Sequence, residues 1–386
     1  MDINSNFVEK QLEKLERIKK MYFNTPLIRL DVEYMEENYE VYSKYEPVQM
    51  TGSIKDRLAY YVFKRGYETG KIKEGTKIVE VSSGNTGIAM SALAAYLGHE
   101  IIIVLPDWLS KERYKLLELY GTKLKLTTGE NGFIDAVEIA KEYEKNGYFY
   151  PNQFACVENM QAHKETTAKE IYEQLNELGK SPEVFVAGVS SGGTCAGINE
   201  YVKENKLDMK VYLLEPFKSQ SLTTKGVSNP RHMIQGIGDG FVPDLIDVDK
   251  YDGIVTVCDE RSYLISKKIA EKGLSVGISS GANLLGALKL AKKYKDETGK
   301  IPVIVTVFAD CAKKYLSCEF EQEKYKNNEN NRQEKLRVQY NSNTLFKNKT
   351  KISNNNVENK QLIVYDKKEK IKIKENEQLS KGRNVV

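Results

Sequence analysis

The chain has 386 residues, and 40% of them are hydrophobic, so it can bury a sizeable core in two or three domains. Its formal net charge is only +4, which does not favour nucleic acid or a membrane as a partner. The best apolar run, Ile88–Leu105, contains Gly98, His99 and Glu100 and is not expected to span a bilayer.

Cysteine and histidine usage gives little sign of disulfide or metal chemistry. The five cysteines include no CxxC pair, and their irregular spacing fits a reducing compartment. The start of the chain is polar and acidic rather than basic and then apolar, so we expect a cytoplasmic location. The three histidines lie far apart in the sequence, and no metal site is predicted.

Residues 1–22 form an arm with apolar side chains at helical spacing and charges between them. The apolar positions are Phe7, Val8, Leu12, Leu15, Ile18 and Tyr22. We expect an amphipathic helix that packs on its own domain or on a second subunit.

From residue 25 to residue 310, short apolar runs alternate with helical patterns. The strand-like runs are Lys77–Val81, Glu100–Leu105, Thr122–Leu126, Glu183–Ala187, Lys210–Leu214, Gly253–Val257 and Pro302–Val307. The helical patterns are Ser53–Tyr67, Ile88–Leu97, Lys111–Tyr120, Ile134–Lys145, Asn159–Leu175, Glu260–Glu271 and Ala282–Tyr294. This alternation predicts an α/β fold in which mostly parallel sheets are flanked by helices.

The extension 318–386 is polar and of low complexity, and we expect it to be largely disordered. Two strand-like pieces, Leu362–Tyr365 and Lys370–Lys374, allow a weak hairpin. Mixed charges favour a solvated extension over a tail that binds acidic partners.

Three loops rich in glycine and hydroxyl groups are predicted to follow strands and open helices: Ser82–Gly87, Gly188–Thr194 and Gly277–Ala282. Each places backbone N–H groups and short hydroxyls at a helix N-terminus, which is an anion site. Together they predict at least two anionic groups in one crevice. None ends in Gly-Lys-Ser/Thr and none reads GxGxxG, which argues against a P-loop and a dinucleotide site.

A lysine, Lys55, is predicted one turn into the helix that follows Thr51. A helix N-terminus and burial both lower the pKa of a lysine amine. A neutral amine at this position can bond to an aldehyde cofactor.

Five segments resemble, in order and spacing, the cysteine synthase and cystathionine β-synthase family of fold-type II, tryptophan-synthase-β-like pyridoxal-phosphate enzymes. They are Thr51–Arg57, Ser82–Gly87, Gly188–Thr194, Gly236–Pro243 and Gly277–Ala282. The resemblance covers about residues 23–317. It implies a large cofactor-binding domain (23–45 and 151–317), a small mobile substrate domain (46–150), pyridoxal 5'-phosphate as cofactor and a homodimer.

The resemblance also implies roles for individual residues. Lys55 should hold the cofactor and move the Cα proton, Asn85 should bind the ring oxygen, and Ser279 should face the pyridine nitrogen. The expected phosphate ligands are Ser190, Ser191, Gly192, Gly193 and Thr194. The expected ligands of the substrate carboxylate are Ser82, Ser83, Asn85, Thr86 and Gln153.

A serine facing the pyridine nitrogen cannot keep that nitrogen protonated, so the cofactor is a weaker electron sink. This favours loss of a group from Cβ over transamination. We therefore expect β-replacement or β-elimination on cysteine, serine or O-acetylserine.

The sequence departs from the family in four places. It has Gln49-Met50 where Asn-Pro is usual, Ser190-Ser191 where Gly-Thr is common, and Asp239 where cysteine synthases usually have a small apolar residue. The terminal segment begins Asp310-Cys311 instead of Ser-Gly.

Because Asp239 replaces a small apolar residue, the substrate and the nucleophile can differ from those of a cysteine synthase. As a general base it would suit water, giving hydrogen sulfide and L-serine from L-cysteine; alternatively it points to solvent or caps a turn. The family default is the synthesis of L-cysteine from O-acetylserine and sulfide. A third reading is a non-catalytic scaffold for a partner such as serine acetyltransferase, although the intact Lys55 argues against it.

Overall fold

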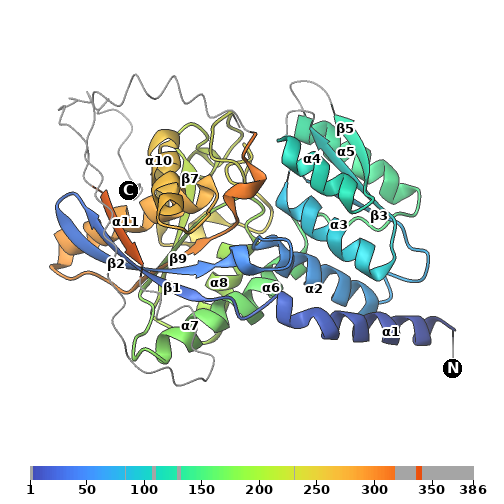
Figure 1. Cartoon of the computed structure of the whole chain (residues 1–386), viewed down its shortest axis with the longest axis horizontal. Helices are drawn as coiled ribbons and strands as arrows, with labels where there is room; N and C mark the ends of the chain where they lie inside the picture. Colours follow the sequence, from blue (N-terminus) through green and yellow to red (C-terminus); the bar gives the residue numbers. More distant parts are fainter. Residues whose placement is uncertain are drawn as a thin grey trace.

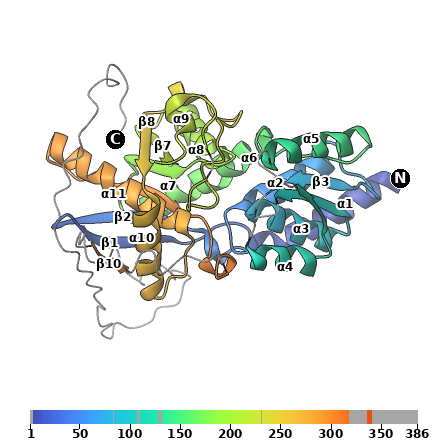
Figure 2. The ribbon, with the colours of Figure 1, turned by 90° about the horizontal axis from the view of Figure 1, so that it is seen from above.

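The computed structural model describes residues 3–82, 84–106, 110–127, 132–229, 231–317 and 336–340. Within these ranges the chain forms two sheets with flanking helices, which lie in two halves of the molecule (Figures 1 and 2). The expected α/β class is confirmed. In this part of the chain no helix has the length and apolar character needed to cross a membrane.

The larger sheet has seven strands in the order β10-β1-β2-β9-β6-β7-β8. Strands β2, β9, β6, β7 and β8 run parallel to one another, whereas β1 is antiparallel to both β2 and β10. The strands are β1 (Leu27–Tyr34), β2 (Glu37–Tyr45), β6 (Val184–Gly188), β7 (Lys210–Pro216), β8 (Gly253–Val257), β9 (Ile304–Phe308) and β10 (Leu336–Tyr340).

The smaller sheet is parallel throughout, in the order β3-β4-β5. Its strands are β3 (Ile78–Val81), β4 (Ile101–Pro106) and β5 (Lys123–Thr127). Every residue of β3 is buried, as expected for a strand covered on both faces.

The helices flank both sheets (Figure 1). The α-helices are α1 (Ile3–Ile18), α2 (Lys55–Glu68), α3 (Asn85–Leu97), α4 (Lys111–Leu119), α5 (Gly132–Lys145), α6 (Val157–Ala162), α7 (Lys169–Asn176), α8 (Gly193–Glu204), α9 (Ser221–Thr224), α10 (Asp259–Glu271) and α11 (Ile278–Thr298). Short 3-10 helices are η1 (Lys19–Met21), η2 (Glu46–Val48), η4 (Val248–Lys250) and η5 (Ala312–Lys314), and η3 (His163–Ala168) is a π-helix. The single helix expected over Asn159–Leu175 is therefore the series α6, η3 and α7.

The N-terminal helix α1 packs along α2 in the half that holds the smaller sheet (Figure 1). Its Phe7 ring meets Tyr67 and His99 edge-on, with ring centroids 6.1 and 6.2 Å apart. The arm thus covers apolar surface of its own chain, the first of the two uses expected for it.

The hairpin of β1 and β2 was not anticipated. In β1 the buried residues Ile28, Leu30 and Val32 alternate with less buried ones, which is strand periodicity. The two turn residues, Met35 and Glu36, both have positive φ angles, at 51° and 67°. A turn of this kind normally carries Asn-Gly, so the usual hairpin signal was missing from the sequence.

One strand lies in the C-terminal extension, for which we expected little regular structure. Residues 336–340 form β10, which pairs antiparallel with Leu30–Tyr34 of β1. The hairpin expected from Leu362–Tyr365 and Lys370–Lys374 lies outside the described residues.

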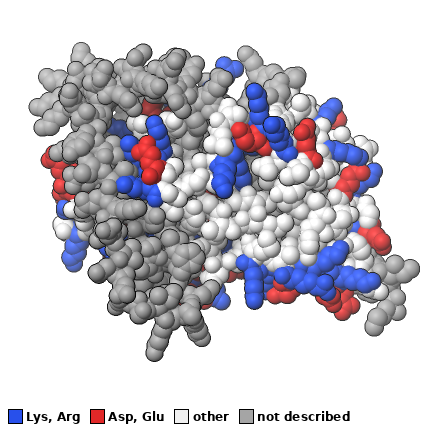
Figure 3. Space-filling view, in the orientation of Figure 1, with Lys and Arg blue, Asp and Glu red and all other residues white. Residues whose placement is uncertain are grey.

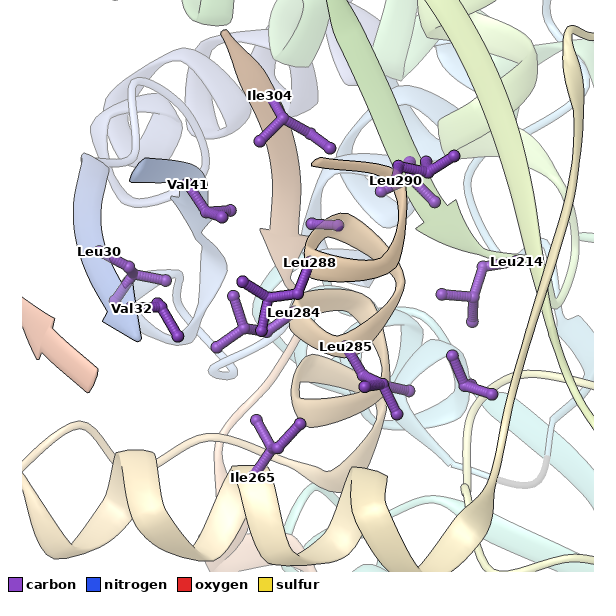
Figure 4. Close-up of a cluster of buried hydrophobic side chains, with 14 of the residues drawn as sticks. Leu30, Val32, Val41, Leu214, Ile265, Leu284, Leu285, Leu288, Leu290 and Ile304 are labelled. Atoms are coloured by element: carbon purple, nitrogen blue, oxygen red, sulfur yellow. The ribbon is translucent and has the colours of Figure 1, made fainter. Parts of the chain in front are cut away.

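Helix α11 forms the centre of the larger core (Figure 4). Its Leu284 and Leu288 face Val41 of the large sheet, and Leu285 lies toward Ile265 of α10 (Figure 4). A helix that is apolar around most of its circumference must be buried, and this burial fixes where its first turn lies. That first turn carries Ser279.

The surface carries charges of both signs. Figure 3 shows Lys and Arg side chains interleaved with Asp and Glu side chains over the half that holds the smaller sheet. This mixture agrees with the small net charge of +4.

Candidate active site

A pocket lies where the two halves of the molecule meet, lined by loops that begin α3, α8 and α11. The pocket is open to solvent, and its lining is polar and glycine-rich. The expected site residues that line it are Lys55, Ser82, Asn85, Thr86, Gln153, Ser190, Gly192, Gly193, Thr194, Asp239 and Ser279. Ser191 lies just behind the lining, and Ser83 lies outside the described residues.

Lys55 is the first residue of α2, and not one turn into it as expected. The difference arises because the preceding turn is closed by Asp56, whose carboxylate accepts hydrogen bonds from the N–H groups of Thr51 (3.0 Å) and Ser53 (3.4 Å). The Lys55 amine donates to the Ser191 hydroxyl at 3.4 Å. Burial lowers the pKa of Lys55, opposed by the charges of Asp239 and Asp310.

The loop after β6 is shaped to receive an anion. Gly192 has a φ of +84°, a left-handed conformation that favours glycine. A Cβ at Gly193 would lie 2.0 Å from the amide oxygen of Asn159, so no side chain fits there. The Asn159 amide also donates to the Ser191 hydroxyl at 2.9 Å. Bare backbone at the N-terminus of the twelve-residue helix α8 fits a phosphate group.

The loop after β3 is held by its own hydroxyls and by Gln153. The Ser82 hydroxyl accepts from the N–H of Gly87 at 2.8 Å. The Thr86 hydroxyl donates to the Gln153 amide oxygen at 2.7 Å, and the Gln153 amide donates to the Val81 carbonyl at 2.8 Å. Gln153 thereby ties the first turn of α3 to the end of β3, which shapes the place expected for a carboxylate.

The third loop differs from expectation, because the residues before Gly277 form no strand. The first turn of α11 is held instead by the terminal segment of the described core. The N–H of Gly277 donates to the Asp310 carbonyl at 2.9 Å, and the N–H of Ala309 donates to the Ser280 hydroxyl at 3.1 Å. Ser279 lines the pocket from this turn.

Two residues that the sequence left without a role hold Asn85. The Asn85 amide donates to Asp310 Oδ2 at 2.7 Å, and Lys314 donates to Asn85 Oδ1 at 2.8 Å. Tyr315 donates to the same carboxylate oxygen of Asp310. The departure from the family at Asp310 was the signal that could have found this clamp.

Asp239 lines the pocket, and its Oδ2 atom accepts a hydrogen bond of 2.7 Å from the Ser190 hydroxyl. Its orientation is therefore toward the pocket and not toward bulk solvent. Burial raises the pKa of Asp239, opposed by the Ser190 hydrogen bond, by the charge of Lys55 and, least of these, by His232. A carboxyl group with a raised pKa is a stronger base once ionised.

A second charge cluster lies outside the pocket lining. Arg57 pairs with Glu46 at 2.8 Å and with Glu170 at 2.7 Å, and Lys44 pairs with Glu170 at 2.7 Å. Burial lowers the pKa of Lys44 to about 8, although Glu170 opposes the shift. These groups satisfy one another, which indicates a structural role. Within the described ranges, no group of His, Cys, Asp and Glu side chains suits a metal ion.

Residues 18–310 match the family described as "Pyridoxal-phosphate dependent enzyme". The chain is 38% identical over 304 residues to cysteine synthase B of Campylobacter jejuni, covering 78% of this chain and 97% of that protein. It is also 38% identical over 298 residues to a probable cysteine synthase of Bacillus subtilis, covering 76% and 94%.

Among solved structures, a hydrogen sulfide-producing enzyme from Fusobacterium nucleatum is similar with a TM-score of 0.75 and 43% identity. The match covers 79% of this chain and 91% of that one. An aspartate-to-asparagine variant of the same enzyme, 42% identical to this chain, was solved in complex with an alpha-aminoacrylate intermediate.

The family match and the relatives agree with the chemistry of the pocket. They make the chain an enzyme of cysteine metabolism that uses pyridoxal phosphate, and they support replacement or elimination at Cβ of a small amino acid. The chain belongs to the cysteine synthase family of pyridoxal-phosphate-dependent enzymes.

Proposed function

We propose that the enzyme converts L-cysteine and water into L-serine and hydrogen sulfide. The observation that carries this proposal is the Asp239 carboxylate in the pocket, close enough to Lys55 for each to shift the pKa of the other. A carboxylate would repel hydrosulfide, the nucleophile of cysteine synthesis, but it can take a proton from water.

The cofactor would be held by Lys55 and by the loop Gly192–Thr194, with Asn85 and Ser279 at its ring. When bound, it supplies an electron sink that stabilises negative charge at Cα and lets a group leave from Cβ. The Ser82 and Thr86 loop would orient the substrate carboxylate. The Asn85 clamp by Asp310 and Lys314 keeps that amide from turning.

Lys55 moves the first proton in this scheme. Since burial lowers its pKa, a larger share of the amine is neutral near pH 7 than for a surface lysine. The neutral amine takes the Cα proton of cysteine, the bond between Cβ and sulfur breaks, and hydrosulfide leaves. The same amine later returns the proton to Cα.

Asp239 moves the second proton. The oxygen of water bonds to Cβ while one water proton passes to the Asp239 carboxylate. Asp239 then releases this proton to solvent, where it balances the hydrosulfide that has already left. The sum is L-cysteine plus water giving L-serine plus hydrogen sulfide, with no oxidant or reductant. General-base assistance of this kind contributes about 10²–10⁴-fold to a rate.

The relatives support the proposal in two ways. A structural neighbour at 43% identity is named for hydrogen sulfide production. An aspartate-to-asparagine variant of that neighbour was solved with an intermediate bound. If a base acts only after the bond between Cβ and sulfur has broken, its removal should trap the intermediate formed at that point.

The test is to incubate the enzyme with L-cysteine alone and to identify the products. We expect equal amounts of hydrogen sulfide and L-serine. Asp239→Asn should release about one hydrogen sulfide per site and then stall. Asp244→Asn, an exposed aspartate in the following segment, is the matched control and should behave like the wild type. Pyruvate and ammonia as main products would instead establish simple desulfhydration.

The second candidate is cysteine synthesis from O-acetylserine and sulfide, which the names of the curated relatives favour. Comparing kcat/KM for O-acetylserine with sulfide against kcat/KM for L-cysteine distinguishes the two. A non-catalytic scaffold for a partner such as serine acetyltransferase would give a cofactor spectrum that no amino acid changes.

A further inference from the structure

We propose that Ser190 is a positioning residue for Asp239, and that it is not a ligand of the cofactor phosphate through its hydroxyl. This inference rests on the proposed role of Asp239 as the base for water addition. It joins two of the four departures from the family pattern, which are 49 positions apart in the sequence, into one functional unit.

The contact between the two residues is fixed by the backbone as well as by side chains. The Ser190 hydroxyl donates to Asp239 Oδ2 at 2.7 Å. One residue earlier in each segment, the N–H of Gly238 donates to the carbonyl of Val189 at 2.9 Å. The main-chain bond sets the two loops in register, so the serine and the aspartate meet in the pocket.

The loop that carries Asp239 is tied down on its other side by His232 and Ser219. His232 Nδ1 accepts from the N–H of Ile234 at 3.1 Å, so Nε2 carries the hydrogen and donates to the Gly238 carbonyl at 2.9 Å. The Ser219 hydroxyl donates to the same carbonyl at 3.1 Å. With the backbone held, the remaining freedom of Asp239 is rotation of its side chain, and this is the motion that Ser190 restrains.

A serine hydroxyl has one proton to donate. Because Ser190 gives it to Asp239, the same hydroxyl cannot donate to a phosphate at the same time. The bare backbone of Gly192 and Gly193, with Thr194, remains for the anion at the start of α8. In Asp239, Oδ2 is held by Ser190, which leaves Oδ1 to accept a proton from water.

The titration of Asp239 provides a signature that a merely structural serine would not change. The charged or titratable groups that act on Asp239 are Lys55 from α2 and His232 from its own loop. A hydrogen bond donated to a carboxylate favours the ionised form, so its removal raises the pKa of that carboxyl. Ser190→Ala should therefore shift the acid limb of serine formation to higher pH.

The experiment compares Ser190→Ala, Ser190→Thr and Asp239→Asn as holoenzymes with L-cysteine. We expect Ser190→Ala to release a burst of hydrogen sulfide and then to form serine about 10–100-fold more slowly, the effect of one hydrogen bond to a charged group. Ser190→Thr keeps the hydroxyl and should recover most of the rate. The carboxyl band of Asp239, identified in infrared difference spectra by its loss in Asp239→Asn, should titrate at higher pH in Ser190→Ala.

The outcomes separate this inference from the proposed function. Serine formation at the wild-type rate in Asp239→Asn would overturn the proposed function itself. If Asp239→Asn stalls but Ser190→Ala keeps the wild-type rate and infrared titration, the role of Ser190 is wrong while that of Asp239 stands. Loss of bound cofactor in Ser190→Ala would place the hydroxyl on the phosphate and also overturn the inference. Ser190→Gly, which places the residue common in the family, provides a second variant if the alanine protein does not fold.

Discussion

Lys55 and Arg57 lie two residues apart in the first turn of α2, yet their basic groups have opposite surroundings. Although burial disfavours its charge, Arg57 has a raised pKa because Glu46 and Glu170 pair with it directly. Lys55 forms no salt bridge with the described residues, and burial lowers its pKa. The difference shows that burial alone does not set the state of a base; direct pairing decides whether it stays charged.

The largest effect should follow Lys55→Ala, which removes the amine that forms no salt bridge with the described residues. The Cα proton then has no acceptor, so hydrogen sulfide release from L-cysteine should fall by at least about 10²–10⁴-fold. The measurement is the initial rate of sulfide release, with the visible absorbance of the bound cofactor recorded alongside. Turnover at the wild-type level would show that Lys55 is not the base that takes the Cα proton.

Arg57, which is held by direct ion pairs, should contribute to the stability of the folded protein. Arg57→Met leaves Glu46 buried without its ion-pair partner and Glu170 with Lys44 alone, and should lower the free energy of unfolding by about 3–5 kcal/mol. Denaturant unfolding measures the loss. The control is Arg29→Met, because Arg29 pairs with Asp31 at a partly exposed site and should lose at most about 1 kcal/mol. Equal losses in both variants would contradict the structural role of the Arg57 cluster.

Glu80 extends the comparison to an acid, since it is a buried carboxyl that forms no salt bridge with the described residues. Burial raises its pKa from 4.5 to about 8, opposed by the N–H of Val81. In the unfolded chain it loses its proton near pH 4.5, so between pH 4.5 and 8 rising pH favours the unfolded state.

This contribution amounts to about 1.4 kcal/mol per pH unit within that window. Glu80→Gln should remove it and so make the slope of the free energy of unfolding against pH more positive by up to about 1.4 kcal/mol per pH unit between pH 5 and 7. Urea unfolding at a series of pH values gives the slope. If wild type and variant keep the same slope, Glu80 is already ionised in the folded protein.

The smallest effect concerns the Asn85 clamp. Asp310→Ala removes the acceptor for the Asn85 amide, and should weaken cofactor binding about 10-fold, the contribution of one hydrogen bond to a charged group. Fluorescence titration of the cofactor-free protein with pyridoxal phosphate measures the change in Kd. Lys313→Ala, an exposed neighbour of the clamp, should leave Kd unchanged. A Kd unaffected by Asp310→Ala would show that Asn85 needs no clamp.

Local patterns were sufficient for the elements that carry the pocket. The apolar runs before Ser82 and before Gly188 are strands β3 and β6, and helices follow both loops. Glycines with no room for a side chain, such as Gly193, explain why these loops are recognisable in sequence. The hairpin of β1 and β2 was not predicted, because its turn residues, Met35 and Glu36, are not those that usually adopt positive φ.

The α/β class, the family and the polar residues around one pocket could be predicted from the sequence, because they depend on short stretches with their own periodicity and turn chemistry. Which of these polar groups are partners could not be predicted and is known from the fold of the chain. Ser190 meets Asp239 across 49 positions, and Asn85 meets Asp310 across 225. Such contacts depend on where loops from different strands end in space, and no local pattern encodes that distance. Among the described residues, the same long-range packing gives Arg57 two carboxylates in direct ion pairs, whereas Lys55 forms no salt bridge.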